Sequence, residues 1–120
     1  MTSLQNYRDL IVWQKSMGLT EAIYRLSSQL PKEETYGMCS QLRRAAVSVP
    51  ANIAEGQAGH GRGEFLQFLG MARGSLAELE TLLTLCDNLN LLPQASVQSA
   101  LSDCEEVGKL LTGLVKSLRR

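Results

Sequence analysis

Residues 64–90 carry the clearest apolar periodicity in the chain. Apolar side chains recur there every three or four residues, at Phe65, Phe68, Leu69, Ala72, Leu76, Leu79, Leu83 and Cys86. This spacing places all of them on one face of an α-helix, because residues three and four apart lie on the same side. A long helix with one apolar face must be covered by other elements. The segment therefore predicts a helical bundle.

Three further segments show helical periodicity. Pro31 separates the first from the second, and Pro93 precedes the last. Short connections favour successive helices that run in opposite directions. We therefore expect one all-α domain over residues 1–120, an antiparallel up-down-up-down four-helix bundle. Its helices are expected at about 11–30, 35–57, 64–90 and 94–118.

The composition agrees with a helical core and excludes several classes of protein. Hydrophobic residues make up 44% of the chain but aromatic residues only 5%, so the core must be mainly aliphatic. Three widely spaced cysteines without a CxxC pair indicate neither a disulfide framework nor a zinc site. No apolar run approaches the roughly 20 residues of a membrane span. We expect no membrane association and a reducing, cytoplasmic location.

The stretch RRAAVSVPANIAEG, residues 43–56, is amphipathic through a proline. Pro50 lacks an amide hydrogen and so leaves the carbonyl of Ala46 without its helical donor, which predicts a bend there. Opposite the apolar face lies a polar stripe at Gln41, Arg44, Ser48, Asn52 and Glu55.

This polar stripe has two interpretations. It is either a solvated helix face or a polar network, buried in the bundle or between subunits, in which Glu55 meets Arg62 or Arg73. Arg43 falls away from the stripe. We expect Arg44 in the network and Arg43 pointing outward, toward phosphate or a partner.

The glycine-rich segment GQAGHGRG, residues 56–63, is expected to be a connection. It lacks the Lys-Ser/Thr ending of a P-loop and a preceding strand, so it is more typical of a turn than of an anion site. His60, within it, has no nearby nucleophile, and the chain has no ExxH pair of the kind that builds di-iron sites. We therefore expect no catalytic residue, no metal site and no cofactor, and a protein that is not an enzyme.

Two other helix faces are candidates for subunit or close helix packing. Small residues at helical spacing, Gly70, Gly74 and Ala77, lie on the reverse face of the third helix. The first helix has a second apolar stripe at Trp13, Met17 and Tyr24. An α-helix with two apolar stripes is expected to be covered on two sides.

The chain is formally neutral, with 12 basic and 12 acidic residues, so it lacks the general excess of positive charge that favours nucleic acid. The basic residues are nevertheless concentrated in the first half and at the end of the chain, whereas the third helix and the start of the fourth are acidic. Such asymmetry can give a neutral protein one basic surface. The candidate contacts to nucleic acid or to a partner are Arg25, Arg43, Arg62, Arg119 and Arg120.

Three strings resemble a known family: YRDLIVWQKSMGLTEAIYRL, LPKEETYGMCSQLRRAAVSVPANIAEG and GEFLQFLGMARGSLAELETLL. They span most of residues 7–92 and are similar to the bacterial four-helix bundle proteins, also called 23S ribosomal RNA intervening-sequence proteins. The resemblance implies a homopentameric ring of antiparallel bundles. It also implies similarity to the accessory variability proteins of diversity-generating retroelements, whose strongly basic pentamers bind a reverse transcriptase and nucleic acid.

These observations lead to two functional hypotheses. The first is a non-enzymatic, oligomeric binding protein whose partners are its own copies and RNA or a nucleic-acid-processing protein. A ring would let weak basic sites act together through avidity, despite the zero net charge. The alternative is a scaffold or adaptor that binds only protein.

Overall fold

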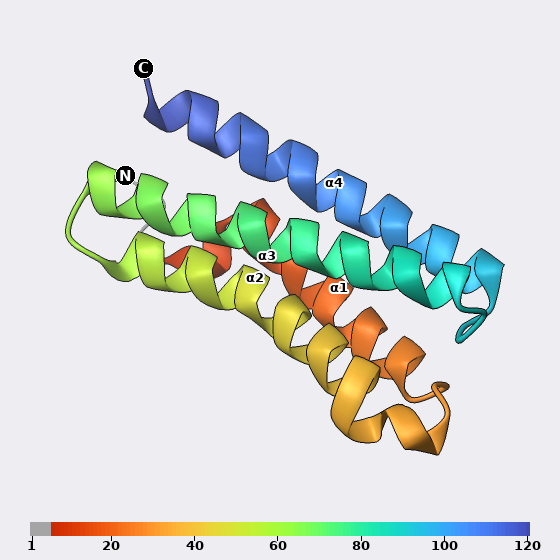
Figure 1. Ribbon diagram of the computed structural model, residues 1–120. Coiled ribbons are helices and arrows are strands. Elements are labelled where there is room, and N and C mark those ends of the chain that lie inside the picture. The colour runs from red at the N-terminus through yellow and green to blue at the C-terminus, as the bar shows by residue number, and fades with distance from the viewer. Residues whose placement is uncertain (1–5) are drawn as a thin grey trace.

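The computed structural model describes residues 6–120, which are helical and contain no strand (Figure 1). This confirms the all-α prediction. The α-helices are α1 (Ile11–Ser27), α2 (Ser40–Ala58), α3 (Arg62–Asn88) and α4 (Gln94–Leu118). Shorter elements precede α1 and α2: the 3-10 turns η1 (Tyr7–Asp9) and η2 (Lys32–Glu34), and the π-helical turn η3 (Thr35–Cys39). No helix within the described residues is long and apolar enough to cross a membrane.

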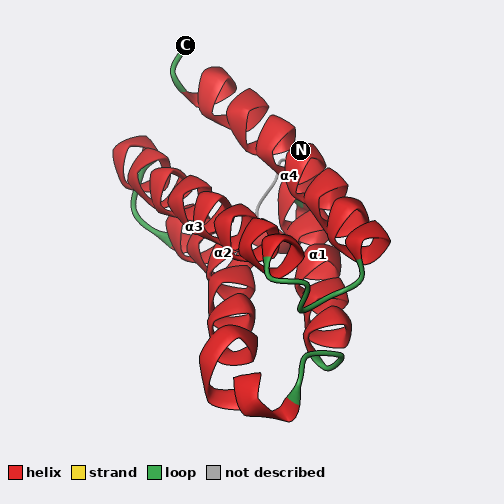
Figure 2. Cartoon of the chain, turned by 45° about the vertical axis from the view of Figure 1, so that its right-hand side comes forward, coloured by secondary structure: helices red, strands yellow, loops and turns green. Residues whose placement is uncertain are grey.

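The four α-helices pack around one elongated core, in a molecule of 49 × 23 × 21 Å. The α2–α3 pair has the most extensive contact, α1 lies against α2 and α4, and α3 lies against α4 (Figures 1 and 2). The predicted apolar face of α3 supplies much of the core. Its buried members are Leu69, Ala72, Leu76, Leu79, Leu83 and Cys86, whereas Phe65 and Phe68 are half-buried.

Helix α2 continues through Pro50, and a hydroxyl from α1 compensates for the missing amide. The Oγ1 atom of Thr20 lies 3.0 Å from the carbonyl oxygen of Ala46, the acceptor that Pro50 leaves without a helical donor. The same hydroxyl lies 2.8 Å from the carbonyl oxygen of Ser16, one turn earlier in α1, so it shares its single proton between two acceptors. A buried proline in α2 is thus matched by a specific threonine in α1.

A break in helical geometry occurs at Gly37, before α2, whereas α2 is uninterrupted at Pro50; the bend expected at Pro50 stays a prediction. Gly37 has φ −112° and ψ −107°, within the π-helical turn η3. The turn is ordered by the Glu34 side chain, whose Oε1 accepts a hydrogen bond of 3.1 Å from the amide of Met38. Pro50 does not interrupt α2 because it removes only one donor, and Thr20 replaces that donor.

The glycine-rich connection is shorter than predicted. Helix α2 extends to Ala58 and α3 begins at Arg62, so Gly56 and Gly63 are helical. Gly56 is buried, and a Cβ there would come within 2.6 Å of Phe68 Cβ. Its missing side chain therefore lets α2 and α3 approach closely. Of the residues that remain in the connection, Gly61 adopts φ +143°, which disfavours any other residue.

The interaction between Thr20 and Ala46 predicts the effect of a conservative substitution. Thr20→Val keeps the shape of the side chain but leaves the buried Ala46 carbonyl without a donor, so it should lower the free energy of unfolding by about 1–3 kcal/mol. Thr84→Val is the matched control, because the hydroxyl of Thr84 is exposed and donates only within α3. Denaturant unfolding of both variants measures the difference; equal losses would contradict this role of Thr20.

Candidate functional site

The centre of the polar stripe forms a network between α2 and α3. The Nδ2 group of Asn52 donates to the carbonyl oxygen of Ser48 at 2.8 Å and to its Oγ at 3.0 Å. Ser48 Oγ in turn lies 2.8 Å from Ser75 Oγ on α3. The hydrogen bonds satisfy these half-buried polar groups, as burial requires. The network joins helices within one chain, and Ser75 is a member that the sequence did not reveal.

The charged ends of the stripe do not join this network. Gln41, Arg44, Glu55 and Arg73 are exposed. The two ion pairs within residues 6–120 join Lys15 to Glu106 at 3.5 Å and Lys109 to Glu105 at 3.9 Å. Within one chain Glu55 therefore forms no ion pair with Arg62 or Arg73, and a pairing between subunits stays a prediction. These charged groups stay in water because the free energy needed to desolvate them would exceed the attraction within a single ion pair.

Arg43 and Arg44 have the opposite placement to the one expected. Arg43 is half-buried: its Nε donates to Ser27 Oγ at 2.8 Å, and its Nη2 donates to the carbonyl oxygen of Tyr24 at 3.2 Å. Its guanidinium carbon also lies 4.6 Å from the centre of the Tyr24 ring. The last turn of α1 attracts this cation because the carbonyls there carry partial negative charge. Arg44 is the exposed member of the pair.

These residues line an open groove where α1 ends and α2 begins, which we call the arginine groove. It encloses about 680 Å³. Its lining residues are Tyr24, Thr35, Tyr36, Cys39, Ser40, Arg43, Arg44, Val47 and Ser48. They include two arginines, no carboxylate, and a tyrosine, Tyr36, that is 96% exposed.

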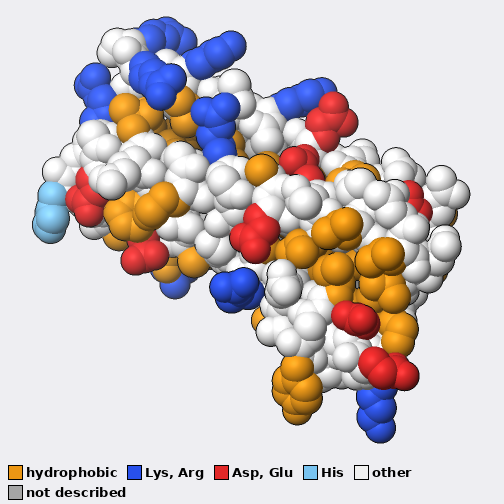
Figure 3. Space-filling model, in the orientation of Figure 1, with side chains coloured by type: hydrophobic (Ala, Val, Ile, Leu, Met, Phe, Trp, Pro, Cys, Tyr) orange, Lys and Arg blue, Asp and Glu red, His pale blue; other side chains and the backbone are white. Residues whose placement is uncertain are grey.

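A second positively charged surface lies where α3 begins and α4 ends. The Nη1 group of Arg62 donates to the carbonyl oxygen of Arg120 at 3.5 Å, which brings the start of α3 next to the residues that follow α4. Lys and Arg side chains gather at this end of the molecule (Figure 3). We call it the basic end and define it by Arg62, Lys116, Arg119 and Arg120. Arg25 lies elsewhere, in a shallow hollow between α1 and α4 that also contains Asp103.

The predicted packing faces are only partly covered within the chain. Trp13 is half-buried and packs edge-on against Tyr7, with ring centres 5.3 Å apart, whereas Met17 and Tyr24 are 37% and 42% exposed. Gly70 and Gly74 are exposed, and a Cβ at either would meet no atom within 4 Å. Ala77 is exposed at the edge of a hollow between α3 and α4.

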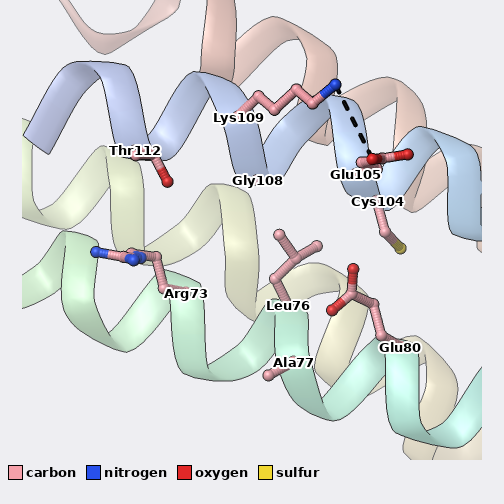
Figure 4. A pocket seen from close by; sticks show the side chains of 9 residues that line it. All are labelled: Arg73, Leu76, Ala77, Glu80, Cys104, Glu105, Gly108, Lys109 and Thr112. Atoms are coloured by element: carbon pink, nitrogen blue, oxygen red, sulfur yellow. Dashed lines mark ion pairs between the residues drawn. The ribbon is translucent and has the colours of Figure 1, made fainter.

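This hollow encloses about 500 Å³ and brings opposite charges close to buried apolar groups (Figure 4). The Leu76 side chain and the Glu80 carboxylate extend from α3 toward α4, while Cys104 extends from α4 toward α3 (Figure 4). Burial, followed by the charges of Glu80 and Asp103, raises the pKa of Cys104 from 9.0 to about 12. A thiol with this pKa stays protonated at neutral pH and is a poor nucleophile or metal ligand.

The other buried thiol has similar chemistry. Burial, and to a smaller extent the charge of Glu34, raises the pKa of Cys86. Within the described part of the chain, no three His, Cys, Asp or Glu side chains are grouped so that they could hold a metal ion. His60 is exposed, and its amide donates to the Glu64 side chain at 2.8 Å, which joins the connection to the first turn of α3.

The fold and these surfaces define an all-α protein of four helices with a basic end and an arginine-lined groove. The chain belongs to the 23S rRNA-intervening sequence protein family, whose model matches residues 8–113. This confirms the resemblance drawn from the sequence strings.

A solved structure supports the same assignment. The chain is similar to a protein of unknown function from the S23 ribosomal protein family of Bacteroides thetaiotaomicron VPI-5482, whose crystal structure was determined at 1.70 Å resolution. The TM-score is 0.82 and the sequence identity 28%, over 88% of this chain and 96% of that chain. No curated protein matches the chain.

The raised pKa of Cys104 predicts a loss of stability in alkaline solution. Above pH 9.0 the unfolded chain releases this thiol proton while the folded chain keeps it up to about pH 12. The free energy of unfolding should therefore fall by about 1.4 kcal/mol per pH unit in this window, and the contribution should be constant at lower pH. Denaturant unfolding at several pH values measures the slope.

Cys104→Ala supplies the control for this slope. The variant should be less stable at every pH because it leaves a cavity, but it should lack the part of the alkaline slope that the thiol causes. Other titrating groups contribute equally to both proteins. Identical slopes for the two proteins would contradict the raised pKa.

Proposed function

We propose that this protein is a non-enzymatic, oligomeric RNA-binding protein that contacts RNA through its basic end. The observation that carries the proposal is the meeting of Arg62 and Arg120 where α3 begins and α4 ends. Lys116 and Arg119 add positive charge to the same end, and residues 107–120 contain no Asp or Glu. A local excess of guanidinium and ammonium groups attracts phosphates even when the whole chain is neutral. The family's name, which refers to an intervening sequence of 23S rRNA, agrees with an RNA partner.

Oligomerisation would make this modest basic surface effective. We propose an antiparallel up-down-up-down bundle that assembles as a homopentameric ring, with the small-residue face of Gly70, Gly74 and Ala77 against a neighbouring subunit. The exposure of these residues supports the proposal, because small side chains allow another helix to approach closely. Several basic ends in one particle would bind one RNA with higher avidity than a single copy.

We place this activity in the cytoplasm. The three cysteines are free, with Cys86 and Cys104 buried, which suits a reducing compartment. The proposal involves no catalytic step, metal or cofactor. The protonated thiols and the exposed, solitary His60 provide no activated nucleophile or base.

The basic end can be tested with a combined variant, Arg62→Gln with Arg119→Gln and Arg120→Gln. We expect it to bind a fluorescent, structured RNA at least about tenfold more weakly than the unchanged protein. The slope of log affinity against log salt concentration should also be shallower, by the amount that corresponds to about three fewer phosphate contacts per chain. Fluorescence anisotropy over a range of salt concentrations measures both. Arg25→Gln, an exposed arginine outside the basic end, is the control; an effect as large as that of the combined variant would contradict a localised site.

A protein-only scaffold is the alternative function, and a different observation favours it. Met17, Tyr24 and Val47 are exposed apolar side chains on α1 and α2, where a partner protein could bury them. A scaffold predicts capture of a protein that is insensitive to salt and unaffected by the combined arginine variant. Absence of any RNA binding at low salt, together with such capture, would replace the first proposal by this one.

Assembly is tested by a substitution on the small-residue face. Gly74→Leu meets no atom within 4 Å in the isolated chain, so the monomer should fold and gain helix propensity. It should nevertheless obstruct a neighbouring helix and lower the particle mass measured by light scattering. Gly113→Leu is the control, because Gly113 is also helical, exposed and open. An unchanged mass for Gly74→Leu would exclude this face as the subunit interface.

A further inference from the structure

We propose that the arginine groove binds one nucleotide unit of unpaired RNA, with its phosphate at Arg43 and Arg44 and its base against Tyr36. This inference rests on the proposed RNA binding but uses a different surface. The groove lies where α1 ends and α2 begins, whereas the basic end lies where α3 begins and α4 ends. The two surfaces would thus contact separate parts of one RNA.

The charge of the groove calls for an anionic ligand. Two of its nine lining residues are arginines and none is acidic. Within residues 6–120, the ion pairs involve Lys15 and Lys109, so neither arginine is neutralised by a carboxylate. Both positive charges line the same groove, so an oxyanion bound there would be attracted by each of them. Phosphate fits this requirement because its oxygens accept the planar fork of guanidinium donors.

Arg43 is already held in position for such a ligand. Its contacts with Ser27 Oγ and the Tyr24 carbonyl use two of its five N–H donors, and the Tyr24 ring supports the guanidinium plane. Three donors remain for an oxyanion. Because the side chain is ordered before binding, little rotamer entropy is lost when the ligand arrives. Arg44, which is exposed, can move to complete the contact.

Tyr36 provides the feature that distinguishes a nucleotide from a simple anion. Its side chain is 96% exposed, so it contributes almost nothing to the core. The turn that carries it is nevertheless ordered, by the Glu34 contact to Met38 and by a hydrogen bond of 2.8 Å from Thr35 Oγ1 to the carbonyl oxygen of Lys32. An exposed aromatic ring on an ordered turn is a stacking platform for an unpaired base.

The groove has the dimensions and chemistry of a small-ligand site. Its volume of about 680 Å³ falls within the range of roughly 300–1,000 Å³ that such sites occupy. The Ser40 hydroxyl also lines it and can bond to a ribose or a base edge, whereas the hydroxyls of Thr35 and Ser48 already bond within the chain. An acidic peptide would use the arginines but has no need of the exposed ring. A duplex keeps its base faces stacked, so the groove should select unpaired RNA.

The test compares two probes and a graded set of variants. The probes are a fluorescein-labelled single RNA strand of about eight nucleotides and a hairpin that holds the same eight nucleotides paired in its stem, a length that spans only a few stacking sites. Tyr36→Ala should weaken binding of the single strand about tenfold and leave duplex binding unchanged, since one stacked base is lost. Tyr36→Phe should retain the binding because it keeps the ring. Arg44→Gln should weaken single-strand binding, whereas Arg25→Gln should not.

The outcomes separate this inference from the proposed function. Tyr36→Ala and Arg44→Gln could leave single-strand binding unchanged while the combined basic-end variant abolishes it. That result would reject RNA binding at the arginine groove but would agree with the proposed function at the basic end. Equal losses for both probes in Tyr36→Ala would also overturn the stacking role. A third outcome is that neither probe binds the unchanged protein, while a glutamate-rich peptide binds it and no longer binds Arg44→Gln. That outcome would show that the groove binds protein and would reject RNA as its ligand.

Discussion

The contact of the Thr20 hydroxyl with the carbonyl of Ala46 fixes how α1 lies against the proline-containing part of α2. Helix α2 contacts both α1 and α3, and it contains a buried proline that leaves one carbonyl without a helical donor. A threonine on α1 supplies the donor and so holds α1 and α2 in register. That register brings Arg43 to the end of α1 and forms one wall of the arginine groove.

The molecule separates its polar surfaces along its length. The Ser48, Asn52 and Ser75 network joins α2 to α3 near the middle and satisfies its own groups. Charged groups remain at the periphery: the basic end where α3 begins, and the arginine groove where α2 begins. This arrangement explains how a chain with equal numbers of basic and acidic residues can present two local excesses of positive charge.

The helical elements and the family could be predicted from the sequence, because apolar periodicity and local strings are properties of neighbouring residues. Most of the buried face of α3 was predicted, although Leu82 was missed and Phe65 and Phe68 are only half-buried, and the family model matches residues 8–113. The candidate site was predicted less well. The helical wheel separated Arg43 from Arg44 but assigned their directions in reverse, since the direction depends on where α1 ends and not on α2 alone.

The sequence by itself determined four amphipathic segments, an aliphatic core and the absence of net charge, since these follow from residue types and their spacing. Only the tertiary structure decided which polar groups meet. It placed Thr20 against Ala46, Ser75 against Ser48, Arg62 against Arg120 and Tyr36 beside the arginines. These pairs come from different elements, and the packing of one helix on another sets their distances, which no local pattern records.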